Sequence, residues 1–209
     1  MKKLSILALM AVVLGALSLT SCNVDNSSST SLPSKTEAAY MFSELGSRNT
    51  GTLLYYGTST QTLDSINGVQ LTVTASDSMA YITDFPVSIY SRYIKDQDLR
   101  EALAEAGSET LKVKLIPYSY NSKVFVGYPY TLDVKLNYGG AEHTASFQFW
   151  GAQYTYLQMN YSNTYRLVFT ITLAGVYLDK STTSLLAVPD SNGTYTTSSA
   201  IPCYFAVKK

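Results

Sequence analysis

The chain has 209 residues, long enough for one domain with a sizeable hydrophobic core. Its 15 basic and 15 acidic side chains balance, and its charged fraction of 14% is low against about 25% in typical soluble domains. Because the sequence contains no block of basic residues, its composition argues against nucleic acid as a partner. The 18 tyrosines, with many Ser, Thr and Asn residues, are typical of β-rich extracytoplasmic proteins.

A short apolar segment with a basic start opens the chain. Lys2 and Lys3 precede a mainly apolar stretch of 16 residues, from Leu4 to Leu19. A transmembrane helix needs roughly 20 apolar residues, so this stretch is short for a membrane span. A positive start, a short apolar core and small residues before a polar stretch predict a secretory signal peptide over residues 1–21.

The end of this segment carries a more specific motif. Leu19-Thr20-Ser21-Cys22 resembles the lipobox of bacterial lipoproteins, which implies that Cys22 is the lipidated first residue of the mature protein. One myristoyl chain binds a membrane only marginally, whereas two or three longer chains, such as palmitate, hold a protein there stably. The resemblance therefore implies an outer-membrane lipoprotein of the cell envelope, facing the periplasm or the surface. An ordinary cleaved signal with an incidental cysteine is the alternative.

A polar spacer and a helix follow the cysteine. Residues 22–34 are rich in Ser, Asn and Thr and predict a flexible tether, while residues 35–209 are expected to form a single β-rich domain. Ser34 and Glu37 have the spacing of a capping box. Apolar residues on one helical face, followed by Gly46, predict a helix over residues 35–46.

Short strands with turn signals occupy the first half of the domain. Residues 52–57 form an apolar run, and the alternation from Val69 to Ala75 after an Asn67-Gly68 turn signal predicts a strand. Residues 79–83 are expected to pair with that strand, before Asp84-Phe85-Pro86 breaks the pattern.

Helical spacing returns before the second half of the chain. Leu99 and Leu103 lie on one helical face, with Asp98 fitting an N-terminal box and Gly107 marking the end. Apolar residues over 89–94 predict an earlier helical turn.

Alternating strand patterns dominate the rest of the chain. They cover residues 111–115, 130–136, 143–149, 165–178 and 201–207, and the second and third of these are joined by a glycine-rich turn. Short strands, hairpin turns and few helices predict a mainly β, antiparallel, β-sandwich-like fold with one or two short helices. An α+β fold is the alternative.

The sequence offers little for catalysis. The single histidine, His143, alternates with apolar residues on a strand, which favours a structural role, and no Gly-x-Ser-x-Gly elbow or phosphate loop is present. Cys203 lies in an apolar strand pattern and is expected to be a buried, inert thiol. Asp133 and Glu142 lie on the two arms of one hairpin, but a solvated face is the simpler interpretation. We therefore expect no enzyme, no cofactor and no metal site.

Aromatic residues are the strongest positive feature. Tyrosines flank one loop near residues 118–130, and Trp150 and further tyrosines cluster near residues 150–165. Exposed aromatic rings stack on sugars or anchor protein interfaces, although tyrosine also suits any half-buried pleated surface. The predicted function is non-catalytic binding of a glycan or an envelope protein, and the alternative is a structural, fimbrial-type subunit that exchanges its last strand. The candidate binding residues are Tyr128, Tyr130, Trp150, Tyr154 and Tyr156.

A wider resemblance rests on three features together. The lipobox, the Ser/Asn tether and the segment Ile82-Thr83-Asp84-Phe85-Pro86-Val87 resemble gut Bacteroidetes lipoproteins in a domain family of unknown function, from about Ala38 into the last strands. The resemblance implies an envelope location and a single β-rich domain, without catalytic residues. In that group, Asp-Ser before an apolar residue resembles an O-glycosylation site, and Ser65 and Ser78 fit it, with a turn role as the alternative for either serine.

Overall fold

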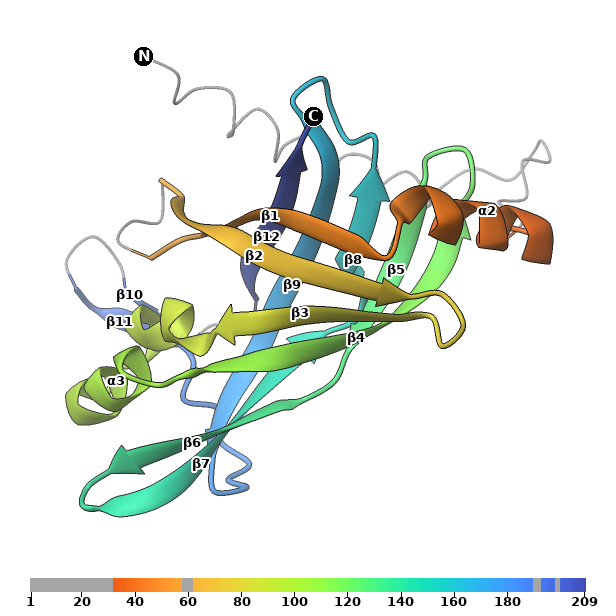
Figure 1. Ribbon diagram of the computed structural model, residues 1–209. Coiled ribbons are helices and arrows are strands. Elements are labelled where there is room, and N and C mark those ends of the chain that lie inside the picture. Colours follow the sequence, from red (N-terminus) through yellow and green to blue (C-terminus); the bar gives the residue numbers. More distant parts are fainter. Residues whose placement is uncertain (1–31, 58–61, 190–192, 198–199) are drawn as a thin grey trace, which may run out of the picture. The chain divides into compact units, whose positions relative to one another are not determined.

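A largely antiparallel sheet dominates the structure (Figure 1). The computed structural model describes residues 32–57, 62–189, 193–197 and 200–209. The predicted signal peptide, Cys22 and most of the tether lie outside the described residues. Within these ranges, no helix combines the length and apolarity required to span a membrane.

Three short helices occur in the described part of the chain: α2 (Lys35–Leu45), the 3₁₀ helix η1 (Val87–Tyr93) and α3 (Gln97–Ala104). The strands are β1 (Arg48–Tyr55), β2 (Asp64–Thr74), β3 (Met79–Pro86), β4 (Ser108–Ser119), β5 (Val124–Pro129), β6 (Leu132–Tyr138), β7 (Ala141–Trp150), β8 (Ala152–Met159), β9 (Tyr165–Leu178), β10 (Ala187–Pro189), β11 (Tyr195–Thr197) and β12 (Ile201–Lys208). The prediction of a mainly antiparallel β fold with few helices is confirmed.

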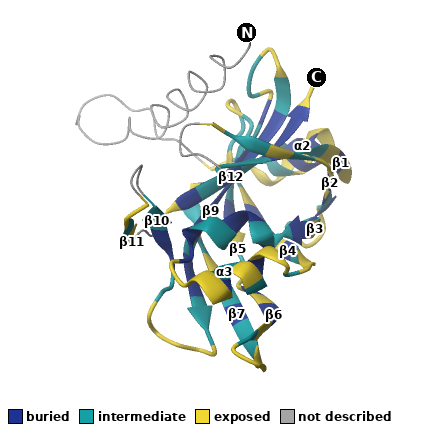
Figure 2. Ribbon diagram, turned by 90° about the vertical axis from the view of Figure 1, so that its left-hand side faces the viewer, coloured by how far each residue is buried: buried dark blue, intermediate teal, exposed yellow. Residues whose placement is uncertain are grey.

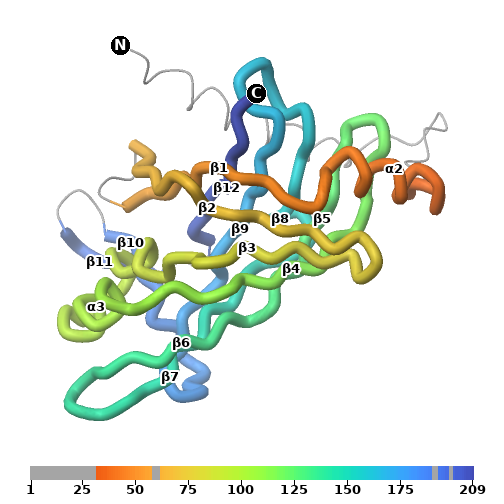
Figure 3. The backbone as a smooth tube through the Cα atoms, in the orientation of Figure 1, coloured from red at the N-terminus to blue at the C-terminus, as the bar shows by residue number. Residues whose placement is uncertain are grey.

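The main sheet closes on itself into a barrel-like arrangement. Ten strands follow the order β12-β1-β2-β3-β4-β5-β8-β9-β7-β6 among the described residues, and β12 also pairs with β9. The long strand β9 makes this closure possible: its first half pairs with β8 and β12, and its second half pairs with β7. Figure 3 follows this path, with the β6–β7 hairpin extending beside the second half of β9.

Alternation along the strands fills the inside of this sheet with apolar side chains. Phe125, Phe147, Phe169 and Phe205 come from four different strands and are fully buried. Successive strand residues point to opposite faces, so one face of each strand supplies the core. Figure 2 shows the complementary pattern, with exposed residues on α3 and at the tip of the β6–β7 hairpin.

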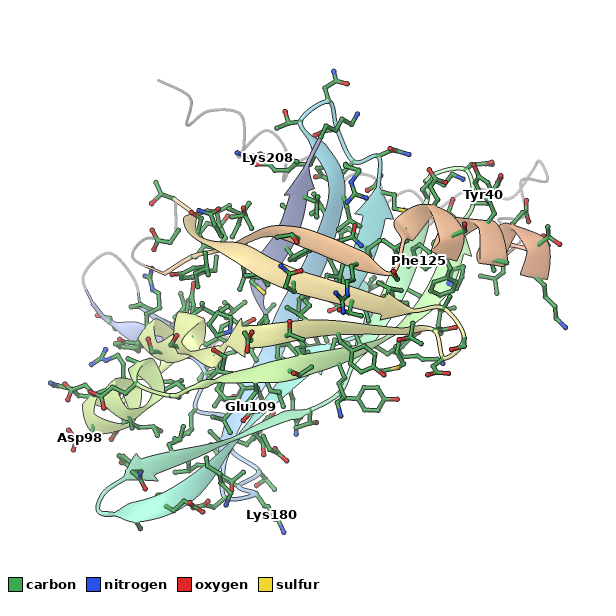
Figure 4. The ribbon with its side chains drawn as sticks, in the orientation of Figure 1. Tyr40, Asp98, Glu109, Phe125, Lys180 and Lys208 are labelled. Carbon is green, nitrogen blue, oxygen red and sulfur yellow. The ribbon has the colours of Figure 1, made fainter. Side chains whose placement is uncertain are left out.

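Helix α2 begins as its sequence predicts. The Ser34 hydroxyl accepts a hydrogen bond from the Glu37 backbone N–H at 3.3 Å, and the Glu37 carboxylate accepts one from the Ser34 N–H at 2.8 Å. The helix packs on the sheet through Phe42, whose ring centroid lies 5.0 Å from that of Phe125 (Figure 4). On its outer side, Glu44 forms an ion pair with Lys123 at 3.1 Å.

Two predicted chain breaks are β-bulges inside strands. Asn67-Gly68 lies within β2, where Gly51 pairs with Val69 and Thr52 with Asn67, leaving Gly68 as the extra residue at φ 80°. A bulge of this type needs a glycine in the left-handed conformation, as a tight hairpin turn does. The Asn-Gly pair is therefore compatible with either structure. The prediction of a turn here is wrong.

The second bulge lies in β3, which continues through Asp84 to Pro86 instead of breaking. Asp84 has φ 53°, the register shifts between Ile82 and Phe85, and the Phe85 ring is fully buried. Burial of that ring keeps the strand in the sheet across the irregular residue.

Helix α3 is capped two residues earlier than its predicted N-terminal box. Asp96, not Asp98, is the N-cap, and its carboxylate accepts a hydrogen bond from the Leu99 backbone N–H at 2.9 Å. Strands β5 and β8 have no counterpart among the predicted strands, because their tyrosine-rich sequences favour aromatic loops. This difference places the candidate binding residues on the sheet.

Candidate functional site

Three of the candidate aromatic residues lie on neighbouring parts of the sheet and not on loops. Tyr128 belongs to β5, Trp150 ends β7, and Tyr154 belongs to β8. Their side chains are 45%, 43% and 47% exposed. We call these three residues the aromatic surface.

Their outward orientation follows from strand alternation. Phe125 on β5, and Thr155 and Leu157 on β8, are fully buried, so the residues at alternate positions face outward. Tyr128 and Tyr154 occupy such outward positions. The same rule applies in β7, where Phe147 is buried and the strand then ends at the exposed Trp150.

Two of the three rings contact each other, and the third lies against the neighbouring residue Gly151. The ring centroids of Trp150 and Tyr154 are 5.8 Å apart, with an interplanar angle of 43°. The next residue, Gly151, lies against Tyr128: a Cβ atom at position 151 would approach Tyr128 Cδ1 to 2.8 Å. The lack of a side chain at Gly151 therefore allows the Tyr128 ring to lie against the residue that follows Trp150.

Hydrogen bonds fix the backbone beneath these rings. The Thr155 hydroxyl donates to the Trp150 carbonyl at 2.5 Å, and the Thr172 hydroxyl donates to the Tyr154 carbonyl at 2.6 Å. Both threonines are buried. Because these buried hydroxyls are satisfied, the hydrogen bonds hold the backbone of Trp150 and Tyr154 in a defined position.

The other two candidate residues differ from these three. Tyr130 is 55% exposed and follows β5, with its backbone N–H donating to the Lys112 carbonyl at 2.9 Å. Tyr156 is only 7% exposed, and burial raises the pKa of its hydroxyl. It lies between Val126 of β5 and Thr170 of β9, whose strands flank it on both sides. The Tyr156 ring is therefore part of the packed sheet rather than of the exposed surface.

Two lysines beside the aromatic surface were not among the candidate residues. Lys112 and Lys114 occupy outward positions of β4, since Leu111, Val113 and Leu115 are buried. Lys114 is directly opposite Tyr128 in the β4–β5 ladder. The alternation of these lysines is visible in the sequence, but the pairing of β4 with β5 is a property of the tertiary structure.

The single histidine takes part in a polar contact at the edge of the fold. His143 Nδ1 lies 2.5 Å from Asp179 Oδ2, and the Thr144 backbone N–H donates to Asp179 Oδ1 at 2.9 Å. These two hydrogen bonds lower the pKa of the Asp179 carboxyl group. They join the start of β7 to the residue after β9, which is a structural connection of the kind that the strand pattern predicts for His143.

The acid pair considered for glycoside hydrolysis is separated. In the β6–β7 ladder Asp133 is opposite Ser146, and Glu142 is opposite Asn137. The offset of four residues along the strand corresponds to roughly 13 Å, longer than the carboxylate separations of about 5–9.5 Å that glycosidases use. Ser146 donates to Asp133, and Lys135 forms an ion pair with Glu142 at 2.9 Å.

Cys203 lies inside the sheet, as expected. Its thiol is fully buried and accepts a hydrogen bond from the Tyr90 hydroxyl at 3.3 Å. Burial raises the pKa of the thiol to about 12, so it stays protonated at neutral pH. Within the described ranges, no group of three His, Cys, Asp or Glu residues is arranged to hold a metal ion.

An open hollow of about 430 Å³ lies between α2 and the end of β2. Its lining is mostly apolar and includes Phe42, Val73 and Ala75. It contains no charged side chain, and it is formed by other elements than the aromatic surface.

Comparison with known proteins gives one match. Residues 46–178 match a protein family described as a domain of unknown function (DUF4840). No curated protein and no solved structure matches the chain significantly. The expected membership in a domain family of unknown function is confirmed, although the match begins after α2 and ends with β9.

Proposed function

The chain belongs to the DUF4840 family, whose function is unknown, and we propose that it is a lipid-anchored envelope protein that binds a glycan without catalysis. The aromatic surface of Tyr128, Trp150 and Tyr154 carries this proposal. These three rings are large and exposed, Trp150 and Tyr154 contact each other, and threonine hydrogen bonds hold the backbone carbonyls of these two residues.

The chemistry of the surface suits a carbohydrate chain. The C–H faces of sugar rings pack on aromatic rings, while tyrosine hydroxyls and amide side chains hydrogen-bond to sugar hydroxyls. Gln158 shares the outward face of β8 with Tyr154, is partly exposed and supplies such an amide. An exposed surface of rings fits one side of an extended chain better than a small enclosed molecule.

The proposed anchor rests on the sequence before the domain. The lipobox at Leu19-Thr20-Ser21-Cys22 precedes a polar spacer that ends at the cap of α2. Twelve residues at full extension span about 40 Å. Such a spacer would let the domain reach ligands beyond the lipid headgroups of the envelope membrane.

The alternative of a strand-exchanging subunit has weaker support. β12 of the same chain pairs with β1 along one edge and with β9 along the other. Its inward residues Ile201, Cys203 and Phe205 are buried. Replacing this strand by one from another molecule would require opening the sheet on both sides, so binding through the aromatic surface is the better-supported function.

Trp150 makes the test direct, because it is the only tryptophan of the chain. We expect its fluorescence to change when a recognised polysaccharide binds, and we expect Tyr128→Ala and Tyr154→Ala to weaken binding. Binding by Trp150→Ala is measured by calorimetry, because this variant lacks the fluorescent tryptophan. Tyr40→Ala is the matched control: Tyr40 is 55% exposed but lies on α2.

If Tyr128→Ala and Tyr154→Ala bind a glycan array as the unmodified protein does, the aromatic surface is not the binding site. Binding of an envelope protein in place of every glycan would reassign the surface to a protein partner. The anchor is tested separately by Cys22→Ala, which should abolish incorporation of labelled palmitate and release the protein from the membrane fraction. Palmitate incorporation that persists in this variant would overturn the anchor.

A further inference from the structure

Two lysines share the outer face of the sheet with the aromatic surface. Lys112 and Lys114 are two residues apart on β4, so they point the same way and their Cα atoms are roughly 7 Å apart. Lys114 is opposite Tyr128 of β5, and the Lys112 carbonyl accepts the hydrogen bond from the backbone N–H of Tyr130. Lys114 is therefore a cross-strand neighbour of Tyr128, while its ammonium group lies at the Asp77 carbonyl, between β2 and β3.

Neither lysine is neutralised by an acidic side chain of the described residues. Their cross-strand neighbours on β3 are Tyr81 for Lys112 and Met79 for Lys114. The Lys114 ammonium group donates to the backbone carbonyl of Asp77, a neutral acceptor that leaves the positive charge in place. The lysine ion pairs of the described ranges involve Lys123 and Lys135 instead.

The acidic residue of β4 lies on the other side of the strand. Glu109 is two residues before Leu111 and four before Val113, both of which are buried. The register shift in this region affects β3, so β4 keeps its alternation. Figure 4 places Glu109 at the start of β4. The outward face of β4 is therefore positively charged up to Ile116, which pairs with Val126.

We infer that the ligand of the aromatic surface is an acidic glycan, with carboxylate or sulfate groups at Lys112 and Lys114 and sugar faces on Tyr128, Trp150 and Tyr154. This inference rests on the proposed function and names its ligand class. A ligand that crosses β4, β5 and β8 meets the two charges first and the rings next, because neighbouring strands lie about 4.8 Å apart.

Charge complementarity selects an acidic chain over a neutral one. Two like charges at this spacing repel each other, and an anion placed between them relieves that repulsion as well as adding two attractions. Because the lysines lie at the surface, these attractions are screened by salt. The ring contacts are not ionic, so they should persist at high ionic strength.

The test measures Trp150 fluorescence of the full chain in detergent against four polymers of similar size: polygalacturonate, dextran sulfate, neutral dextran and polyglutamate. We expect tighter binding of an acidic polysaccharide than of neutral dextran, with affinity falling between 50 and 500 mM NaCl. Polyglutamate carries carboxylates without sugar rings, so it should bind more weakly and change the Trp150 emission only at higher concentration. A preference for polygalacturonate over dextran sulfate, or the reverse, identifies the anionic group.

The decisive variant is Lys112→Gln/Lys114→Gln. We expect it to lose about tenfold in affinity for the acidic polysaccharide and most of the salt dependence. The matched control, Lys35→Gln/Lys95→Gln, changes the net charge equally at two exposed lysines on other elements and should bind normally. Circular dichroism of both variants verifies the fold.

The outcomes separate this inference from the proposed function. Neutral dextran binding as tightly as the acidic chains, without salt dependence, overturns the acidic ligand and leaves glycan binding intact. Equal affinity losses in both double variants also overturn it, because the effect would then come from net charge. Polyglutamate binding more tightly than either acidic polysaccharide assigns the surface to an acidic peptide. Failure of every glycan to bind overturns the proposed function itself.

Discussion

Replacing Gly51 with alanine should destabilise the closure of the sheet. Gly51 lies in β1 next to the bulge, where β1 begins to pair with β12. A Cβ atom at this position would lie 2.6 Å from the Ala206 carbonyl oxygen and 2.8 Å from the edge of the Phe205 ring. Both distances are shorter than carbon contacts allow, so the missing side chain leaves room for the buried ring and the neighbouring strand.

The size of the effect follows from what must move. The nearest atom belongs to the backbone of β12, which is paired on both edges and cannot turn away as a side chain would. Overpacking of this kind costs about 1–3 kcal/mol of unfolding free energy. For a chain of this length that corresponds to a fall in Tm of roughly 2–12 °C.

The assay is urea and thermal unfolding, followed by circular dichroism and by the fluorescence of Trp150. Gly107→Ala is the matched control, because a Cβ atom at Gly107 has no neighbour within 4 Å and the residue has an ordinary φ. That change should be neutral or stabilising by about 0.4–1 kcal/mol, through the unfolded chain. Equal unfolding midpoints for Gly51→Ala and Gly107→Ala would refute the close approach of β1 and β12.

Three further predictions concern single groups. Cys203 should resist alkylation at pH 8 in the folded protein and react on unfolding in urea, since burial raises its pKa to about 12; reaction at the rate of a free thiol before unfolding would contradict its placement. Asp179 has a lowered pKa in the folded state, so its hydrogen bonds to His143 and Thr144 stabilise the fold above the ordinary carboxyl range and are lost as the pH falls through the lowered value. Asp179→Asn should therefore make the unfolding midpoint less dependent on pH in the acidic range. The same pH dependence in this variant and in the unmodified protein would contradict a stabilising role for the hydrogen bonds of Asp179. Ser34→Ala removes the cap of α2 and should cost about 1 kcal/mol, visible as faster amide exchange in α2; equal exchange rates in α2 would show that the capping box does not hold the helix end.

Elements with local signals can be predicted from the residues alone. The capping box of Ser34 and Glu37 fixed the start of α2, and the long alternations predicted β9 and β12 nearly to the residue. The candidate ring residues Tyr128, Trp150 and Tyr154 were also identified from sequence alone. Such signals survive because capping and alternation depend on residues a few positions apart.

Tertiary structure decided how these elements combine and which rings are exposed. Tyr154 and Tyr156 face the same side of β8, yet one is 47% exposed and the other 7%. Tyr156 lies in both ladders, between Val126 and Thr170. Tyr154 lies beyond the residues that pair with β9 and inside the register shift of the β5–β8 ladder, between the paired residues Ala152 and Tyr156. A tyrosine has the same local pattern in either setting, and only the neighbouring strands determine whether its ring is covered. The same pairing brings Lys114 beside Tyr128 and so defines the charge of the surface.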